Sequence, residues 1–325
     1  MVEPREFMNV VNEIVSEIST VYIGNTEPIR KTLTALLVNG NVLFEDYPGL
    51  GKTLLAKAFG KTLGLSYTRI QFTPDLLPAD ITGTKVWRHD RGVFELVKGP
   101  IFTNVLLADE INRAPPKTQS ALLEAMEERQ VTIEGETYRL DRPFFVIATQ
   151  NPIEFEGTYP LPEAQLDRFL LRLSVGYPRS LEDEIAIMEA RLRWGKDDPT
   201  EDLEPVIDRE TLLEMQALVE KNVFVGREIL TYIAMLVRTA RSDGRVEAGP
   251  SPRGALALMK IAKANALMEG RDYVIPDDVK AFAVDALAHR IVIKPEHAFE
   301  GVTGRDVVLS ALQKTPVPKG DGDEA

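Results

Sequence analysis

One short stretch constrains the fold of this chain more than any other: Asp46-Tyr47-Pro48-Gly49-Leu50-Gly51-Lys52-Thr53. It follows the apolar run Val42–Phe44 and precedes residues 54–59, whose apolar positions repeat as they do in a helix. A strand, a glycine-rich loop and a helix in this order form the context of a phosphate-binding loop. Glycines let backbone N–H groups turn toward an anion, and the N-terminus of the helix adds partial positive charge.

The loop predicts a site for a nucleoside triphosphate with Mg²⁺, because Lys52 can reach the β and γ phosphates and the Thr53 hydroxyl can bind the metal. One position departs from the usual pattern, since Asp46 stands where the first glycine is expected. A side chain is tolerated there if φ stays negative, and an acidic group has to point away from the phosphates. The alternative is an ordinary strand-to-helix turn that contains Gly-Lys-Thr. The predicted nucleotide-binding residues of the loop are Pro48, Gly49, Leu50, Gly51, Lys52, Thr53 and Leu54.

Composition indicates a soluble globular protein. The 325 residues suggest about two domains, 44% of them are hydrophobic, and the absence of cysteine excludes disulfides and thiolate metal sites. The N-terminus lacks a signal-peptide pattern, and no apolar run approaches the ~20 residues that span a bilayer. We therefore expect a cytoplasmic location and no membrane partner. The net charge of −12 disfavours non-specific binding to a nucleic-acid backbone.

Apolar runs separated by helical patterns predict a parallel sheet flanked by helices. Two further hairpins are expected, one pairing 85–87 with 93–96 and one pairing 131–133 with 137–140. After residue 177 helical periodicity dominates. We therefore predict an α/β domain over residues 1–177, an all-α domain over 178–315 and a disordered tail over 316–325. The strands of the sheet are expected near residues 42–44, 66–72, 104–108, 144–149 and 169–175, and the later helices near 181–194, 209–220, 226–241, 252–269, 276–289 and 304–313.

Two polar groups follow buried strands, where functional groups of such sheets gather. Asp109 would hold Mg²⁺, mostly through water, and Glu110 would polarise the attacking water. The amide of Asn151, after the next buried strand, can orient that water beside the γ-phosphate. The alternatives are an acidic cap on the first strand and a turn signalled by Asn151-Pro152 on the second.

Three segments, Asp109–Ala114, Ala148–Pro152 and Glu156–Phe169, together resemble the MoxR family of AAA+ ATPases. This family belongs to the helix-2-insert group and is related to the ATPase subunits of magnesium chelatase. The resemblance extends from about residue 7 to 313, and the string from Gly157 to Phe169 is its most specific part. It implies a P-loop AAA+ core, with a parallel sheet between helices, followed by an all-α lid domain.

The resemblance also implies roles for residues outside the loop. Asn151 matches sensor 1, Arg168 the arginine finger that reaches a neighbouring subunit, and Arg253 sensor 2 of the lid. Tyr22-Ile23-Gly24 occupies the position where the family packs adenine. Ser251 and Pro252 suit the N-cap and first position of a helix, which would expose Arg253 at its first turn. The alternative is that both arginines are ordinary surface residues.

Together these features predict an ATPase that hydrolyses ATP with Mg²⁺ at the subunit interfaces of a ring. The resemblance suggests six subunits, chaperone-like remodelling of a partner protein such as metal-cofactor insertion, and a partner that bears a von Willebrand factor A domain. Residues 73–100 and 131–140 occupy the places of the family's helix-2 insert and pre-sensor-1 hairpin, and both would project toward a pore or a partner.

Three other functions stay open at this point. A nucleic-acid motor related to helicases would need a basic hairpin, whereas Glu134-Gly135-Glu136 puts acidic groups at the tip. Arg139 and Arg142 nearby keep that alternative open. A regulatory switch without turnover is disfavoured by the intact set of catalytic groups. A chelatase-type ATPase subunit would share the mechanism and differ in its partner.

Overall fold

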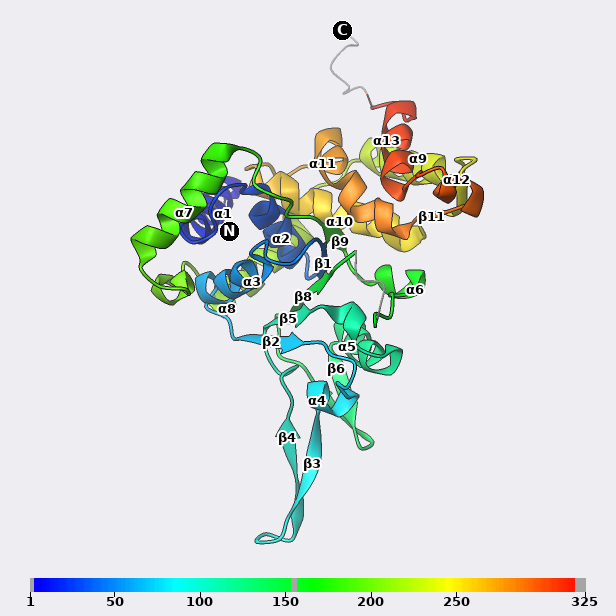
Figure 1. The fold of residues 1–325 in the computed structure, drawn as a ribbon. Coiled ribbons are helices and arrows are strands. Elements are labelled where there is room, and N and C mark those ends of the chain that lie inside the picture. The colour runs from blue at the N-terminus through cyan, green and yellow to red at the C-terminus, as the bar shows by residue number, and fades with distance from the viewer. Residues whose placement is uncertain (1–2, 153–156, 319–325) are drawn as a thin grey trace. The chain divides into compact units, whose positions relative to one another are not determined.

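The computed structural model describes residues 3–152 and 157–318 (Figure 1). The chain divides into two compact units. The sheet unit comprises Asn12–Pro162 and Leu173–Glu214, and the helical unit comprises Met1–Val11, Glu163–Arg172 and Met215–Ala325. The domain boundary near residue 177 stays a prediction. Glu156 of the family-like string and residues 319–325 of the predicted tail lie outside the described residues.

A parallel sheet forms the centre of the sheet unit, as the sequence predicts. Strands β2 and β5, β5 and β8, and β8 and β1 pair in parallel, and the full strand order is β2-β5-β8-β1-β9. The central strands are buried because their apolar runs face helices on both sides of the sheet. The strands are β1 (Val42–Glu45), β2 (Tyr67–Gln71), β5 (Val105–Asp109), β8 (Phe145–Gln150) and β9 (Leu171–Leu173).

Helices begin where the sequence supplies a suitable first turn. Gly51 caps α3 (Lys52–Thr62) in a left-handed conformation, and Pro116 occupies the first position of α5. The short helix α4 and the 3₁₀ turns η1 and η2 are not predicted from periodicity because each is too brief to show one. The remaining bounds are α1 (Pro4–Ser19), α2 (Glu27–Leu37), α4 (Pro78–Thr82), η1 (Ile111–Arg113), α5 (Pro116–Glu128), α7 (Leu181–Trp194), η2 (Pro199–Asp202) and α8 (Arg209–Asn222).

Two antiparallel hairpins emerge from the sheet unit, and both are confirmed. The longer one, β3 (Gly83–Arg88) with β4 (Val93–Lys98), extends as an arm beyond α4 (Figure 1). The shorter one pairs β6 (Gln130–Ile133) with β7 (Glu136–Arg139). Lys85 of the arm forms a 2.6 Å ion pair with Glu136. Residues 73–100 thus contain α4 and this hairpin, and the ion pair braces the hairpin near its base.

The helical unit packs its longer helices around small and branched apolar side chains such as Leu236, Leu258 and Val307. Ser251 caps α10 and accepts a 3.2 Å hydrogen bond from the Arg253 N–H, as predicted for this helix start. Across residues 3–152 and 157–318, no helix combines the length and apolar content needed to cross a bilayer. The elements are α6 (Glu163–Leu166), α9 (Arg227–Arg241), β10 (Val246–Ala248), α10 (Pro252–Met268), α11 (Pro276–Leu287), η3 (Ala288–Arg290), β11 (Val292–Ile293), α12 (Pro295–Phe299) and α13 (Gly304–Lys314).

Candidate nucleotide site

The glycine loop has the backbone geometry of an anion site. Gly49 and Gly51 adopt φ of 82° and 79°, a backbone conformation that would be strained for a residue with a side chain. Helix α3 begins directly after them, at Lys52. The Lys52 ammonium group donates hydrogen bonds to the carbonyl oxygens of Asp46, at 3.0 Å, and Tyr47, at 3.1 Å. Burial lowers the pKa of Lys52, and the neighbouring carboxylates oppose that shift. These hydrogen bonds hold the Lys52 side chain across the loop, where it is predicted to contact phosphate.

The Asp46 side chain explains how this loop tolerates an acid in place of glycine. Its carboxylate accepts hydrogen bonds from the Ser174 hydroxyl at 2.6 Å, the Val175 N–H at 2.6 Å and the Gly176 N–H at 3.3 Å. In the described part of the chain, non-glycine residues with positive φ do not include Asp46. The acid is therefore engaged away from the predicted phosphate-binding surface and ties the loop to the segment after β9.

Asp109 and Glu110 lie at the carboxyl end of β5 and have different partners. One Asp109 oxygen accepts from Arg69 at 2.7 and 3.1 Å, and the other accepts from the Thr149 hydroxyl at 2.6 Å. Glu110 accepts a 2.6 Å hydrogen bond from the Gln71 amide and pairs with Arg113 at 3.2 Å. The two carboxylates are therefore fixed separately, although they are adjacent in the sequence.

The backbone at Glu110 is itself unusual. Its φ is 56°, a left-handed conformation that is costly for a residue with a Cβ atom. The Glu110 N–H donates a 2.8 Å hydrogen bond to the Thr149 hydroxyl, which also reaches Asp109. Thr149 therefore links the end of β8 to both acidic residues at the end of β5.

Sequence reasoning missed Arg69, Gln71 and Thr149. Arg69 and Gln71 are two residues apart on β2, so their side chains lie on the same face of the sheet. The parallel register pairs Gln71 with Asp109. The predicted strands, combined with their order in the sheet, would have been the signal that identifies these residues.

A cavity of about 250 Å³ brings the loop and the acidic residues together. Its hydroxyl and carboxylate groups fit Mg²⁺, because they are hard oxygen ligands. Its lysine and the backbone N–H groups of the loop fit a phosphate chain. Asn151, the predicted sensor 1, also lines it. The lining residues are Asp46, Pro48, Gly49, Leu50, Gly51, Lys52, Thr53, Arg69, Gln71, Asp109, Glu110, Thr149, Gln150 and Asn151.

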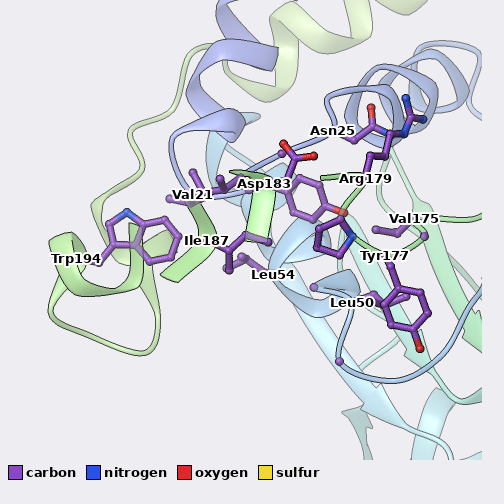
Figure 2. Close-up of a pocket in the computed structure, with 17 residues that line it drawn as sticks. Val21, Asn25, Leu50, Leu54, Val175, Tyr177, Arg179, Asp183, Ile187 and Trp194 are labelled. Carbon is purple, nitrogen blue, oxygen red and sulfur yellow. The ribbon is translucent and has the colours of Figure 1, made fainter. Parts of the chain in front are cut away.

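A second, mostly apolar pocket of about 220 Å³ shares Gly49, Leu50 and Gly51 with this cavity and includes the predicted adenine segment (Figure 2). The Tyr22 ring packs so closely on Gly51 that a Cβ atom there would meet it at 3.3 Å. Burial, followed by the charge of Asp46, raises the pKa of Tyr22 and keeps the phenol neutral. The lining residues include Val21, Tyr22, Ile23, Gly24, Asn25, Gly49, Leu50, Gly51 and Leu54.

The far wall of this pocket was not predicted. It is formed by the turn after β9 and by one face of α7, with Trp194 at one end and Tyr177 at the other (Figure 2). Asp183 and Ile187 contribute from the first turns of α7. A mostly apolar pocket with a few polar groups beside the predicted phosphate loop suits a nucleotide base.

The two remaining predicted residues, Arg168 and Arg253, belong to the helical unit. Arg168 follows α6 and is half-buried, and Arg253 is exposed in the first turn of α10. The described geometry thus assembles the loop, both carboxylates, Asn151 and the adenine segment within the sheet unit. The roles of the two arginines stay predictions.

The matches to known proteins agree with this geometry. Residues 41–171 match the model of the ATPase family associated with various cellular activities (AAA), and residues 238–310 match that of the AAA lid domain. A phosphate loop on a parallel sheet, together with lid helices, defines the chain as an AAA+ ATPase.

Relatives that match over nearly the whole chain identify the family within this class. The uncharacterised protein YeaC of Bacillus subtilis is 48% identical over 309 residues, covering 95% of each chain. Chaperone MoxR1 of Mycobacterium tuberculosis is 40% identical over 321 residues, covering 96% of this chain and 83% of the relative. The crystal structure of a candidate ATPase from Cytophaga hutchinsonii matches with a TM-score of 0.89, 39% identity and 97% coverage of both chains. The chain belongs to the MoxR family of AAA+ ATPases.

Proposed function

We propose that this AAA+ protein hydrolyses ATP with Mg²⁺ at the subunit interfaces of a ring and uses the energy to remodel a partner protein. One observation carries the proposal. Lys52, Asp109 and Glu110 line a single cavity that adjoins an apolar pocket suited to adenine. A binding protein without turnover would need the loop and the base pocket but not the second carboxylate.

Each group at the cavity has a role that its chemistry supports. Thr53 and Asp109 would hold Mg²⁺, which would neutralise phosphate charge and orient the triphosphate. Lys52 contacts the β and γ phosphates once it exchanges its loop carbonyls for them. Glu110 is the general base for the attacking water, and Asn151 orients that water. The hydrogen bond from Gln71 keeps the Glu110 carboxylate in one orientation.

The remaining parts of the proposal rest on family membership. Arg168 acts across an interface on the γ-phosphate bound by a neighbouring subunit, and Arg253 acts from the lid. An arginine suits either position because its guanidinium group is permanently charged and presents a fixed set of donors. The name of the chaperone MoxR1 relative supports protein remodelling. A hexamer, metal-cofactor insertion and a partner with a von Willebrand factor A domain are the specific forms that we propose.

The nucleotide roles are tested with two substitutions and two matched controls. Lys52→Ala should abolish ATP binding measured by calorimetry, whereas Lys61→Ala, on an exposed position of the same helix, should bind normally. Glu110→Gln should bind ATP but release phosphate at least about 100-fold more slowly, with exposed Glu124→Gln as its control. Tight binding by the Lys52 variant, or normal turnover by the Glu110 variant, contradicts the assignment.

Sharing of sites is tested by mixing two inactive variants. Arg168→Ala subunits keep the loop, and Lys52→Ala subunits keep the arginine, so mixed assemblies should contain some complete sites. Recovered phosphate release on mixing is the expected result. If each variant is inactive alone and the mixture also stays inactive, Arg168 does not act in trans.

A further inference from the structure

A buried arginine in the helical unit holds the segment that carries Arg168. Arg290 ends the 3₁₀ turn η3 after α11, and its side chain is 3% exposed. Its Nε donates to the Asp167 carboxylate at 2.6 Å, and its Nη2 donates to the carbonyl oxygens of Asp167 at 3.1 Å and Phe169 at 2.8 Å. Nη1 donates to the carbonyl oxygens of Leu170, at 3.3 Å, and Ala286. Every nitrogen of the guanidinium group is therefore engaged within the protein.

These contacts fix the backbone on both sides of Arg168. Asp167, before it, is held by its carboxylate and its backbone carbonyl. Phe169 and Leu170, after it, are held by their backbone carbonyls. His289, next to Arg290, adds a 3.1 Å hydrogen bond between its Nε2 and the Phe169 carbonyl oxygen. Phe169 is also fully buried. The short segment after α6 therefore behaves as part of the helical core, although it is far from α11 in the sequence.

The same carboxylate reaches the predicted sensor 2. While one Asp167 oxygen accepts from Arg290, the other lies 3.9 Å from the Arg253 Nε and accepts a 3.4 Å hydrogen bond from the Ser251 hydroxyl. Ser251 is also the N-cap of α10, the helix on which Arg253 lies. Asp167 thus joins the start of α10 to the segment of Arg168 through one side chain.

We propose that Arg290 is a positioning residue that, through Asp167, holds Arg168 and Arg253 in a fixed mutual arrangement. This rests on the proposed roles of those two arginines in ATP hydrolysis. The consequence is that the helical unit moves both arginines together, so the site that Arg168 reaches and the site that Arg253 reaches gain or lose these charges together. Because misplacement of a charged group by about 1 Å can cost on the order of 100-fold in rate, the effect should appear in kcat. Arg290 itself does not touch the nucleotide, since its donors are already used.

The test compares Arg290→Lys with Arg271→Lys. Arg271 is a suitable control because it also forms a partly buried pair in the helical unit, donating to Asp278 at 2.7 and 2.8 Å, but does not contact the Arg168 segment. Lysine keeps the charge at either position and removes the planar set of donors. Arg290→Lys should lower kcat for ATP at least about tenfold, with KM for ATP within about twofold because the loop and base pocket are unchanged. Arg271→Lys should leave kcat within about twofold of the parent, even if the Tm of both variants falls by the same amount.

A second comparison separates positioning from general loss of stability. In a background that carries both Arg168→Ala and Arg253→Ala, Arg290→Lys should reduce the residual kcat by less than about twofold, because both groups that it positions are already absent. If Arg290→Lys does not fold, Asp167→Asn is measured in the same way, with Asp278→Asn as its control. The proposal is overturned if the Arg290 and Asp167 variants keep the kcat of their controls. It is overturned together with the arginine-finger role if Arg168→Ala alone turns over normally, so the two failures are distinguishable.

Discussion

The Asp46 carboxylate should be a major determinant of the stability of the sheet unit. Asp46→Ala removes the acceptor of the hydrogen bonds from Ser174, Val175 and Gly176. Asp46 is 6% exposed, so water replaces its carboxylate poorly. The glycine loop and the turn after β9 are also joined by the stacked rings of Tyr47 and Tyr177, whose centroids are 5.8 Å apart. We expect the substitution to loosen one wall of the base pocket without changing Lys52.

The magnitude follows from the bonds that are lost. A hydrogen bond to an ionised acceptor contributes about 1.5–3 kcal/mol. Two of these bonds are 2.6 Å long and one is a weaker 3.3 Å contact. The donors are partly exposed and regain some hydration, so we expect a net loss of about 2–4 kcal/mol. For a unit of this size that corresponds to a Tm lower by roughly 5–15 °C.

Asp46→Gly is the most informative variant because it restores the residue usual in such loops. It should destabilise the unit at least as much as Asp46→Ala, since both lack the carboxylate and the added backbone entropy of glycine costs about 0.5–1 kcal/mol more. Asp90→Ala, an exposed acid in the turn of the β3–β4 hairpin, is the control and should stay within about 0.5 kcal/mol of the parent. Scanning calorimetry gives the comparison. An Asp46→Gly variant that is as stable as the parent would refute the reasoning.

Three further outcomes can be checked on the same material. Thr149→Val removes the hydroxyl that donates to the Asp109 carboxylate and accepts from the Glu110 N–H. Urea unfolding should show a loss of about 1–3 kcal/mol in the free energy of unfolding. Burial, and then the charge of the neighbouring arginine, hold the pKa of His289 well below its usual value of about 6.5, so the unfolded chain binds the proton more readily. The related stability is present above pH ~6.5 and lost below it, and His289→Gln, unlike exposed His89→Gln, should flatten the pH dependence of unfolding between about pH 5 and 6.5. Trp87→Ala should cost about 1 kcal/mol or less in the same assay, because Trp87 is 42% exposed and its ring contacts, to His89 and Phe94, are edge-on.

Much of the fold could be predicted because its signals are local. The buried strands are continuous apolar runs, and helices such as α5 and α10 start at proline, with a serine cap in the second case. Elements without a period were missed. The one-turn helix α4 and the strand β10 are too short for a pattern, and β10 exists because β11 pairs with it.

The candidate site was predictable where its residues follow one another and not where they converge. The loop and the Asp109-Glu110 pair are contiguous, so their types and spacing identify them. Arg69 and Gln71 contact these carboxylates because β2 lies beside β5 in the sheet, a neighbour relationship that no local pattern contains. The wall of the base pocket from α7 was missed for the same reason.

Asp46 shows what a departure from a motif can reveal. The sequence indicates that the acid has to point away from phosphate, but not where it points. In the structure it replaces the flexibility of a glycine by a link to the turn after β9, and the same turn lines the base pocket. The predicted phosphate loop and the wall of the predicted base pocket are thereby joined through one side chain. A change in the loop is transmitted to the pocket wall, and the reverse, through the hydrogen bonds of Asp46. Substitutions at Asp46 should therefore affect base recognition and phosphate binding together, whereas substitutions at Lys52 should affect phosphate binding separately from base recognition.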